Sequence, residues 1–419
     1  MFILEGMQAF ANWLWGIPML LWVVGGGFIM SIRLGFPQFT RLGFILKNTI
    51  GKSFGEKGED GKFSGWQAVT GALASTLGAG NIIGTAMAVA FGGPGGVFWL
   101  WLSGFFCCVI KFCETTMAMK YRRMGDNGVW EGGPQIYLTK GTGWKWISPV
   151  YAVLCIFCLF LAASAQIGSG VDNLVVIAMN VGNLPGALAA VFADDFTGHA
   201  AVGGFVGATV TQSIRWGIAR GCYSNDAGTG VTTIVHAVAD VNHPIQQSMW
   251  AVFEVFFDTI IVCSMTCLVV LTSGVWTLKL DPAIMTATAF EQSLGSFGGL
   301  LVTIAVVLFT FTTACAQIEF TEAQFIALVG EKARGVARWI MLVLILGGGM
   351  VGISKLITYV DFFAGVYVLV NMLGVYWCNG QIVELFKEYF SNPQRWETEK
   401  WAPWVKMEKE YAARKGLNK

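Results

Sequence analysis

The residues that could do chemistry begin in a glycine-rich stretch, residues 70–90, where Gly78, Gly80 and Gly84 surround Asn81. Glycine favours local unwinding of this otherwise apolar helix. Each backbone group freed in hydrocarbon is costly unless something satisfies it, so an opened helix normally lines a cavity or an ion site. Its N–H groups suit a carboxylate, and its carbonyl groups suit Na⁺. On spacing alone, close helix packing through small residues is an equal alternative.

A second stretch, residues 200–230, repeats this pattern in the other half of the chain. Its Gly203, Gly204 and Gly207 could break the membrane part, and corresponding breaks in two halves are typical of a pseudo-symmetric transport site. Its charged and polar residues are expected near the cytoplasmic end, where they form a gate or an interfacial ion pair and do not bind substrate. They are Arg215, Arg220, Asn225 and Asp226.

Hydroxyl groups of Thr310, Thr312 and Thr313 fall within one helical turn of an apolar segment. Neutral oxygen ligands suit a hard cation such as Na⁺. The alternative is that each hydroxyl bonds back to the preceding turn of its helix. Other polar residues inside or near apolar segments are functional candidates, unless they face a helix end where charge costs little. They are Gln166, Gln317, Glu319, Glu114 and Asp258.

Several classes of function are disfavoured. The sequence has no P-loop, no GxSxG, no HExxH and no soluble segment with paired carboxylates near a histidine, so we predict that it is not an enzyme. The Cys155–Cys158 pair lies in an apolar run without neighbouring histidine, and we predict packing cysteines and no organic cofactor or metal centre. The formal net charge of +1 gives no indication of a nucleic-acid partner.

The composition indicates that the lipid bilayer surrounds this chain. Its 419 residues are 55% hydrophobic and 13% charged, with a mean hydropathy of +0.60, whereas soluble domains carry roughly 25% charged residues. Since a span takes about 20 apolar residues, we predict an all-α integral membrane protein with about nine spans. They fall at 10–32, 66–90, 94–120, 146–166, 200–218, 244–272, 298–328, 336–353 and 356–378.

Lysine and arginine gather in alternate connections, which predicts the topology. Connections 33–62, 120–145 and 332–338, together with Arg215 and Arg220, are expected in the cytoplasm, while 167–199, 273–297 and 354–361 are expected outside. This places the N-terminus outside and the C-terminus inside the plasma (inner) membrane of a bacterium or archaeon. It also requires residues 174–192, which glycine, proline and asparagine interrupt, to form a re-entrant or surface-lying segment.

One transmembrane domain is expected over residues 1–380, followed by a cytoplasmic amphipathic tail over 381–419. The tail is rich in lysine, glutamate and tryptophan. It is expected either at the level of the lipid headgroups or as a solvated helix without membrane contact.

The motifs of this chain resemble those of the alanine or glycine:cation symporter family, whose members are similar to the leucine-transporter fold. The resemblance covers most of residues 10–275, with a looser match to about 380. It rests on GFPQF (35–39), LGAGNIIGTAMAVAFGGPGGVFWLW (77–101), KFCETTMAMKYR (111–122), GGPQIYL (132–138), GGFVGATVTQSIRWGIARGCYSNDAGTG (203–230) and FFDTIIVCSMTCLVVLTSG (256–274).

The resemblance implies a bundle of ten core helices in two inverted five-helix repeats, plus one N-terminal helix. It further implies alternating access in which a small neutral amino acid, alanine or glycine, enters the cell with a coupling ion. That ion is expected to be Na⁺, with H⁺ as the alternative. The oligomeric state is left open.

Carried over residue by residue, the resemblance places the backbone of Ala79 and Gly80 against the substrate carboxylate and Asn81 beside substrate and cation. The remaining substrate-binding residues implied are Gln166, Gly204, Phe205, Gly207 and Gln317.

A Na⁺ site is implied in the same way, between the carbonyl groups of Ala74 and Leu77 and the hydroxyl groups of Thr312 and Thr313. Asn81 belongs to the implied sodium ligands as well.

The chain departs from the family pattern in two ways. Ala79 stands where members usually have threonine and Gln317 where they usually have tryptophan, so the preferred substrate does not follow from the resemblance. Only about 35 residues separate Gln166 from the GGFVGAT segment, so the fourth core helix and the first half of the fifth are expected to be missing. The alternative function is therefore a transport-inactive relative that serves as a membrane binding or structural protein.

Overall fold

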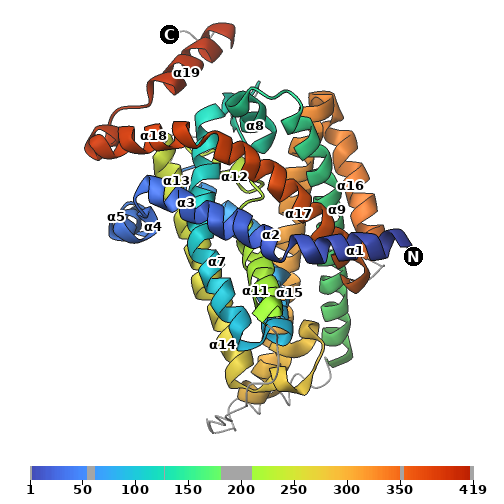
Figure 1. The fold of residues 1–419 in the computed structure, drawn as a ribbon. Helices are drawn as coiled ribbons and strands as arrows, with labels where there is room; N and C mark the ends of the chain where they lie inside the picture. The colour runs from blue at the N-terminus through green and yellow to red at the C-terminus, as the bar shows by residue number, and fades with distance from the viewer. Residues whose placement is uncertain (1, 54–61, 127, 181–209, 350–352, 416–419) are drawn as a thin grey trace.

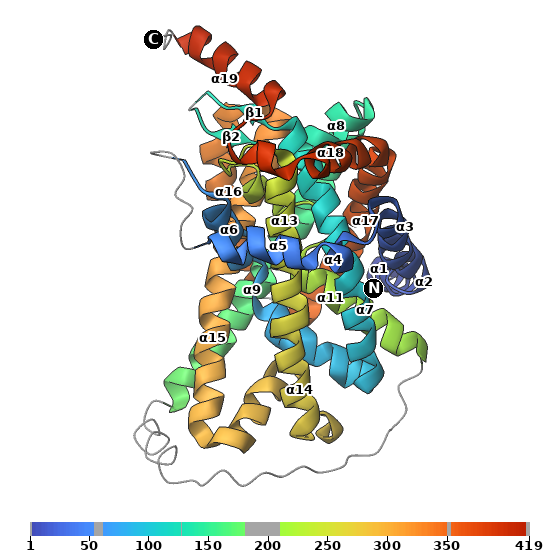
Figure 2. The ribbon, with the colours of Figure 1, turned by 90° about the vertical axis from the view of Figure 1, so that its left-hand side faces the viewer.

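The structure is a computed structural model that describes residues 2–53, 62–126, 128–180, 210–349 and 353–415. Its described elements are helices, apart from a two-stranded antiparallel sheet of β1 (Arg123–Met124) and β2 (Trp130–Glu131). Three long helices run along the length of the molecule, as the two views in Figure 1 and Figure 2 show. They are α7 (Thr85–Tyr121), α9 (Ile147–Asn180) and α15 (Pro282–Val329).

The N-terminal elements lie across these long helices in both views. They are α1 (Phe2–Leu14), α2 (Ile17–Met19), the π-helical η1 (Leu20–Gly25) and α3 (Gly26–Leu34), followed by α4 (Pro37–Thr40), α5 (Leu42–Asn48) and η2 (Ile50–Lys52). Large apolar side chains such as Trp13, Leu21 and Ile29 are exposed on this segment. A row of exposed apolar side chains of this kind is typical of a surface that faces lipid.

The next helix is interrupted early. The helix α6 (Gly65–Thr76) starts at a capping box, in which Ser64 and Gln67 satisfy each other's backbone N–H groups, and it ends before a short non-helical step. The π-helical η3 (Gly80–Gly84) then leads directly into α7. This interruption forms one wall of the central cavity described below.

Glycine corners divide both α7 and α15. Gly93 (φ 63°, ψ −166°) and Gly295 (φ 65°, ψ −168°) have nearly the same dihedral angles, in a region open essentially only to glycine. Three residues after each corner another glycine packs against a carbonyl of the preceding helix: Gly96 against Ala88 and Gly298 against Phe290. The corner at Gly93 separates the two spans predicted at 66–90 and 94–120.

The remaining elements complete the bundle around α7, α9 and α15. They are α8 (Pro134–Thr142), α11 (Val210–Asn225), α12 (Thr233–His236), α13 (Pro244–Val255), the π-helical η5 (Phe256–Cys263), α14 (Ser264–Thr272), η6 (Val275–Leu278), η7 (Glu331–Ala333), α16 (Arg334–Gly349), α17 (Ile353–Trp377), α18 (Asn379–Ser391), η8 (Pro393–Glu397) and α19 (Ala402–Lys415).

Six helices among the described residues are long and apolar enough to cross a membrane. They are Glu5–Leu34, Gly80–Tyr121, Ile147–Ala165, Pro244–Thr272, Ile284–Val329 and Thr358–Trp377. Three of the nine predicted spans are not separate candidates. The span predicted at 66–90 is split by the break after α6, α16 has 16 residues, and 200–209 lie outside the described residues. The leucine-transporter-like arrangement and the span count stay predictions.

The segment predicted to be re-entrant, 174–192, begins as ordinary helix, because α9 continues without interruption through Asn180. Residues 181–192 lie outside the described residues. The candidate span Ile147–Ala165 agrees with the span predicted at 146–166, and the helix itself continues beyond it for about four further turns, as 3.6 residues per turn implies.

The tail packs against the end of the bundle. Trp404 of α19 is fully buried, donates from Nε1 to the Met119 carbonyl at 3.1 Å, and covers the guanidinium of Arg122. His243, which caps α13, is enclosed by tail aromatic side chains including Trp396. Burial lowers the pKa of His243 to about 3, which keeps the ring neutral so that Nδ1 accepts the Ile245 N–H. The tail helix α19 is thus anchored to protein.

We predict that Gly96→Ala lowers the melting temperature of the purified protein. A Cβ at this position would overlap the Ala88 carbonyl oxygen, which belongs to the facing backbone and cannot rotate away. Overpacking of this kind costs about 1–3 kcal/mol. Gly43→Ala is the matched control, because no atom lies within 4 Å of a Cβ at residue 43. Equal melting temperatures for both variants would contradict the close approach.

Candidate functional site

The first break lies where the glycine pattern predicts it. Leu77 leaves the helix with ψ 87°, and the Gly78 N–H donates to the Asn81 side chain (Oδ1, 3.0 Å) in place of a helical carbonyl. The Asn81 N–H in turn donates to the Gly78 carbonyl at 3.1 Å. Asn81 therefore closes the gap in the hydrogen-bond ladder that the glycines open.

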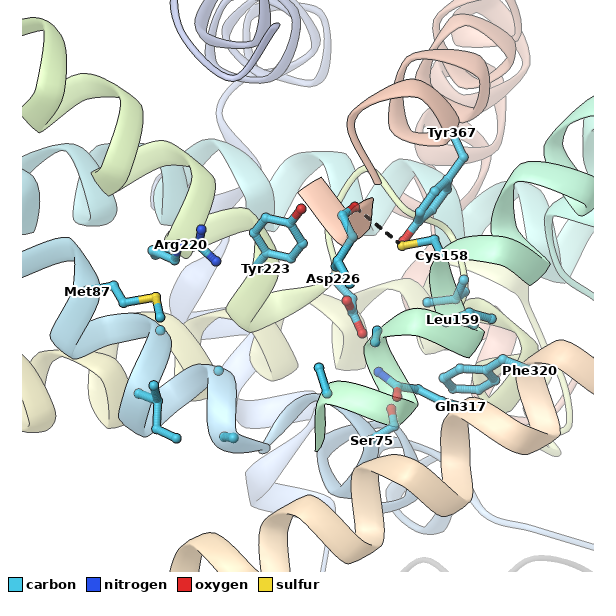
Figure 3. Close-up of a pocket in the computed structure, with 18 residues that line it drawn as sticks. Ser75, Met87, Cys158, Leu159, Arg220, Tyr223, Asp226, Gln317, Phe320 and Tyr367 are labelled. Carbon is cyan, nitrogen blue, oxygen red and sulfur yellow. Dashed lines mark hydrogen bonds between the residues drawn. The ribbon is translucent and has the colours of Figure 1, made fainter. Parts of the chain in front are cut away.

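A cavity of 130 Å³ lies beside this break, between η3, α9, the end of α11, α15 and α17 (Figure 3). Ala79 and Gly80 contribute the start of η3, and Gln317 contributes its side chain from α15. Apolar side chains, among them Leu159 and Phe320, form much of the remaining wall. The structure thus brings together three of the predicted substrate-binding residues around one small, mixed cavity.

A second irregular segment borders the same cavity. Asp226 follows the last residue of α11 with φ 54°, and Gly228 (φ 88°) and Gly230 (φ 78°) continue the non-helical path to α12. The side chain of Asp226 lines the cavity. Irregular backbone at membrane depth is tolerated only where protein or a cavity satisfies it, and this turn meets both conditions.

Three side chains from three different helices donate hydrogen bonds to carbonyl groups of this turn. Lys111 Nζ donates to the Asn225 carbonyl at 3.0 Å, Asn371 Nδ2 to that of Gly228 at 2.9 Å, and Tyr151 Oη to that of Thr229 at 2.6 Å. Each of these donor residues is fully buried. The turn is consequently a specified structure and not a frayed helix end.

Lys111 itself belongs to a buried charged cluster. Its Nζ lies 3.5 Å from Glu254 Oε1, and Glu254 Oε2 lies 2.7 Å from His236 Nε2. Gln247 Nε2 donates to His236 Nδ1 at 2.8 Å, which leaves the proton of the imidazole on Nε2, facing the carboxylate. All of these side chains are fully buried. The cluster holds Lys111 in position against the turn.

Asn81 joins the two breaks and does not line the cavity. Its Nδ2 donates to Asp258 Oδ1 at 2.6 Å and to Ser224 Oγ at 2.9 Å. Ser224 and Thr259 also donate to Asp258, so this carboxylate accepts hydrogen bonds from three side chains. Asp258 lies in the π-helical η5, and π-helical segments are frequent at functional sites. The expected direct contact between Asn81 and substrate is not favoured by this geometry.

An ion pair separates the central cavity from a second cavity of 450 Å³. Arg220 Nη2 lies 3.5 Å from Asp361 Oδ2, with both side chains nearly buried. Arg220 lines both cavities, and Asp361 lines the second. Arg220 thus forms an ion pair, but a nearly buried one between two cavities and not the interfacial pair that was expected near the cytoplasmic end.

The positions of Arg215 and Arg220 do not fit the predicted distribution of the connections between the two sides of the membrane. Both line the second cavity together with Lys279 and Thr358, which belong to connections expected outside the membrane. They therefore cannot lie on the cytoplasmic face while 273–297 and 354–361 lie outside. Which of these connections faces the cytoplasm stays a prediction.

The predicted sodium ligands lie on adjacent helices, since α6 packs against α15. The Thr313 hydroxyl is buried and has no hydrogen-bond partner among the described residues. Thr312 is exposed, and its hydroxyl donates back to the Phe309 carbonyl at 3.1 Å. Leu77 is the residue of the break, whereas Ala74 lies in the last turn of α6. Of these four, Thr313 has the orphan oxygen that a cation ligand requires.

Four predicted substrate-binding residues are not placed. Gly204, Phe205 and Gly207 lie outside the described residues, as does the second break predicted there. Gln166 lies in α9, and its side chain is outside the description.

The sequence analysis missed the structural importance of Lys111, Tyr151, Asn371 and the turn at Asp226. A signal was available in residues 224–230, SNDAGTG, which combine asparagine, aspartate and two glycines next to apolar helices. Their charge was interpreted as cytoplasmic, which removed them from consideration as cavity residues.

A helical membrane protein with two irregular segments around a small central cavity has the features of a secondary transporter. The sequence profile described as the Sodium:alanine symporter family matches residues 1–171 and 169–402. The chain therefore belongs to this family of Na⁺-coupled amino-acid symporters. Family membership confirms the resemblance and the prediction that the protein is not an enzyme.

Individual relatives cover nearly the whole chain. Uncharacterized transporter YflA of Bacillus subtilis (strain 168) is 33% identical, covering 94% of each chain. The sodium/alanine symporter AgcS of Methanococcus maripaludis is 30% identical, covering 90% of this chain and 95% of the relative. The putative sodium/proton-dependent alanine carrier protein YrbD of Bacillus subtilis is 31% identical over 78% of this chain and 79% of the relative.

The comparisons also bear on the shortened segment. The alignment with YflA runs over 449 positions, more than the 419 residues of this chain, so the relative has residues without a counterpart here. The two family matches meet at residues 169–171. This is next to the connection where the sequence analysis expects core helices to be missing.

We predict that Lys111→Met lowers the stability of the protein by roughly 3–5 kcal/mol, because it leaves the buried Glu254 carboxylate without its lysine partner, with the neutral His236 still in contact, and the Asn225 carbonyl without its donor. The double variant Lys111→Met/Glu254→Gln should recover part of this loss. Thermal unfolding in detergent measures both, with Lys406→Met on the exposed tail as the control. A Lys111→Met protein as stable as the wild type would contradict the assigned role.

We predict that Arg220→Gln and Asp361→Asn each reduce uptake of labelled alanine into proteoliposomes by about tenfold or more, because a nearly buried charge that loses its partner costs several kcal/mol. The charge reversal Arg220→Asp/Asp361→Arg should restore uptake in part. Lys279→Gln, in the same outer cavity, is the control. If uptake by the charge-reversed double variant falls by the sum of the two single effects, the ion pair is not required for transport.

Proposed function

We propose that this protein carries a small neutral amino acid, alanine or glycine, into the cell together with Na⁺, by alternating access around the central cavity. The observation that carries the proposal is the pair of irregular backbone segments that border the same central cavity, at Leu77–Gly80 and Asp226–Gly230. Discontinuous helices around a midplane site are the architecture by which secondary transporters bind substrate and ion.

The substrate carboxylate is expected at the start of η3. Ala79 and Gly80 line the cavity at this helix start, where unsatisfied N–H groups and the helix dipole favour an anion. The rest of the wall is largely apolar, with Leu159, Ala162 and Phe320 among its members. A cavity of 130 Å³ with such walls suits a small, uncharged side chain.

The charges around the site support coupling to a cation. Buried charges in a membrane protein are normally paired, and here carboxyl groups outnumber basic groups. Five carboxyl groups and three basic groups lie in or near the site: Glu114, Asp226, Glu254, Asp258 and Asp361 against Lys111, Arg220 and His236. The excess negative charge favours the entry of a cation with the substrate. The orphan hydroxyl of Thr313 is the ligand that we assign to Na⁺.

Uptake into proteoliposomes tests the proposal. Labelled alanine or glycine should accumulate when an inward Na⁺ gradient is applied and should fail to accumulate when choline replaces Na⁺. Accumulation driven by a pH gradient alone would assign H⁺ as the coupling ion. Saturable binding without uptake would favour the alternative of a transport-inactive relative. The shortened segment after Gln166 is the reason for considering this alternative.

We predict that Gly80→Ala raises the KM for alanine by roughly tenfold, the equivalent of about 1.4 kcal/mol, without lowering the melting temperature. The nearest atom to a Cβ at residue 80 is the Tyr223 carbonyl oxygen at 3.9 Å, so the methyl group fits the fold but occupies cavity space at the carboxylate site. Gly43→Ala, away from the cavity, should leave KM unchanged. An unchanged KM in Gly80→Ala would remove the start of η3 from the substrate site.

A further inference from the structure

We propose that Asp226 binds the α-ammonium group of the substrate, with Gln317 as the second acceptor. This inference rests on the proposed function and names the groups that recognise one end of a zwitterion. Asp226 lies in the turn that follows α11, Gln317 lies on α15, and both side chains line the central cavity in Figure 3.

The carboxylate of Asp226 is available for a ligand. It accepts no hydrogen bond and forms no ion pair within the described part of the chain, although its surroundings are those of a protein interior. Asp258, the other aspartate near the breaks, is already hydrogen-bonded by Asn81, Ser224 and Thr259. An unpaired carboxylate in a cavity is costly unless a cation binds to it. Of Asp226 and Asp258, therefore, Asp226 is the one that needs a cationic ligand.

The backbone fixes the direction of this carboxylate. Asp226 adopts φ 54°, a conformation that aspartate tolerates better than most residues. The carbonyl groups on either side of it, those of Asn225 and Gly228, are held by Lys111 and Asn371. Hence the side chain is presented to the cavity by a rigid turn and needs no hydrogen bonds of its own to remain there.

Two further acceptors face the same space. Gln317 Oε1 is buried without a hydrogen-bond partner among the described residues. The Ser75 hydroxyl donates to the Ala72 carbonyl at 2.6 Å, which leaves its lone pairs free, and it lines the cavity near Gln317 in Figure 3. An ammonium group carries three N–H donors. One carboxylate, one amide oxygen and one hydroxyl oxygen match that number and charge.

The arrangement favours an ammonium group over Na⁺ at Asp226. The cavity has an anion-binding helix start at Ala79 and Gly80 and a carboxylate at Asp226, which together match the two charged ends of an amino acid. The orphan hydroxyl assigned to Na⁺, that of Thr313, does not line this cavity. Recognition of both ends would exclude carboxylates that lack an ammonium group.

The test compares Asp226→Asn with wild-type protein in proteoliposomes. We expect KM for alanine to rise by about tenfold to hundredfold, the loss of one charged hydrogen-bonded contact, while the Na⁺ concentration for half-maximal uptake changes less than about twofold. Propanoate, which lacks the ammonium group, should compete poorly with alanine in the wild type and as well as alanine in Asp226→Asn. Glu331→Gln, an exposed carboxylate lining the neighbouring cavity near α12, is the control and should behave as the wild type.

The variant Asp226→Glu keeps the carboxylate charge. It therefore distinguishes a role of that charge in binding from a structural role of the residue. Its KM should rise less than that of Asp226→Asn, and melting temperatures of both variants establish that they fold. An unchanged KM in Asp226→Asn overturns the inference, and so does a shift confined to the Na⁺ dependence, which would make Asp226 a sodium ligand. An equal rise in both variants overturns it as well. A wild type that neither takes up nor binds any amino acid would instead refute the proposed function.

Discussion

The structure depends on satisfying open backbone inside a bundle that lipid surrounds. The turn after α11 leaves the helix in the interior, so its carbonyl groups must find donors within the protein. Lys111, Asn371 and Tyr151 supply them from three separate helices. Because Lys111 brings a charge with it, the interior also needs Glu254, and Glu254 brings His236. A single irregular turn therefore explains why these five polar side chains are fully buried.

The two breaks are mechanically connected through the same network. Asn81 closes the first break with its carbonyl oxygen and reaches Ser224 and Asp258 with its amide nitrogen. Ser224 is the second-last residue of α11, immediately before the turn that carries Asp226. A displacement of either break must therefore shift or break hydrogen bonds at the other. Such a connection gives coupling between substrate and ion a physical route, since both would bind to groups that this network positions.

The sequence predicts the first break well and the second poorly, and the difference has a physical cause. Gly78, Gly80 and Asn81 act locally, through glycine's conformational freedom and a hydrogen bond across three residues. The turn at Asp226 is stabilised by donors 114 and 143 residues away, Lys111 and Asn371, which no local pattern reveals. The break that the glycines predict at residues 203–207 lies outside the described residues. Arg220 was misplaced for a similar reason: the positive-inside rule counts charges, and it cannot see that Asp361 pairs with this one inside the bundle.

The contrast between Asp258 and Asp226 shows how one interior can serve stability and binding at once. Both carboxylates lie near the breaks, yet one accepts hydrogen bonds from three side chains while the other accepts none within the described residues. Two hydrogen-bond donors are close to Asp226. Lys111 donates to the carbonyl group of the preceding residue, Asn225, and Arg220 lines the same cavity as Asp226. Lys111 is occupied by Asn225 and Glu254, and Arg220 is occupied by Asp361. Because Lys111 and Arg220 contact other carboxylates, the Asp226 carboxyl group remains open to a ligand, and its burial becomes less costly whenever a cation occupies the cavity. Binding of a cationic ligand then also gives the Asp226 carboxylate a partner. A transport site can in this way be specific for a charged group without close contacts on every side of the ligand.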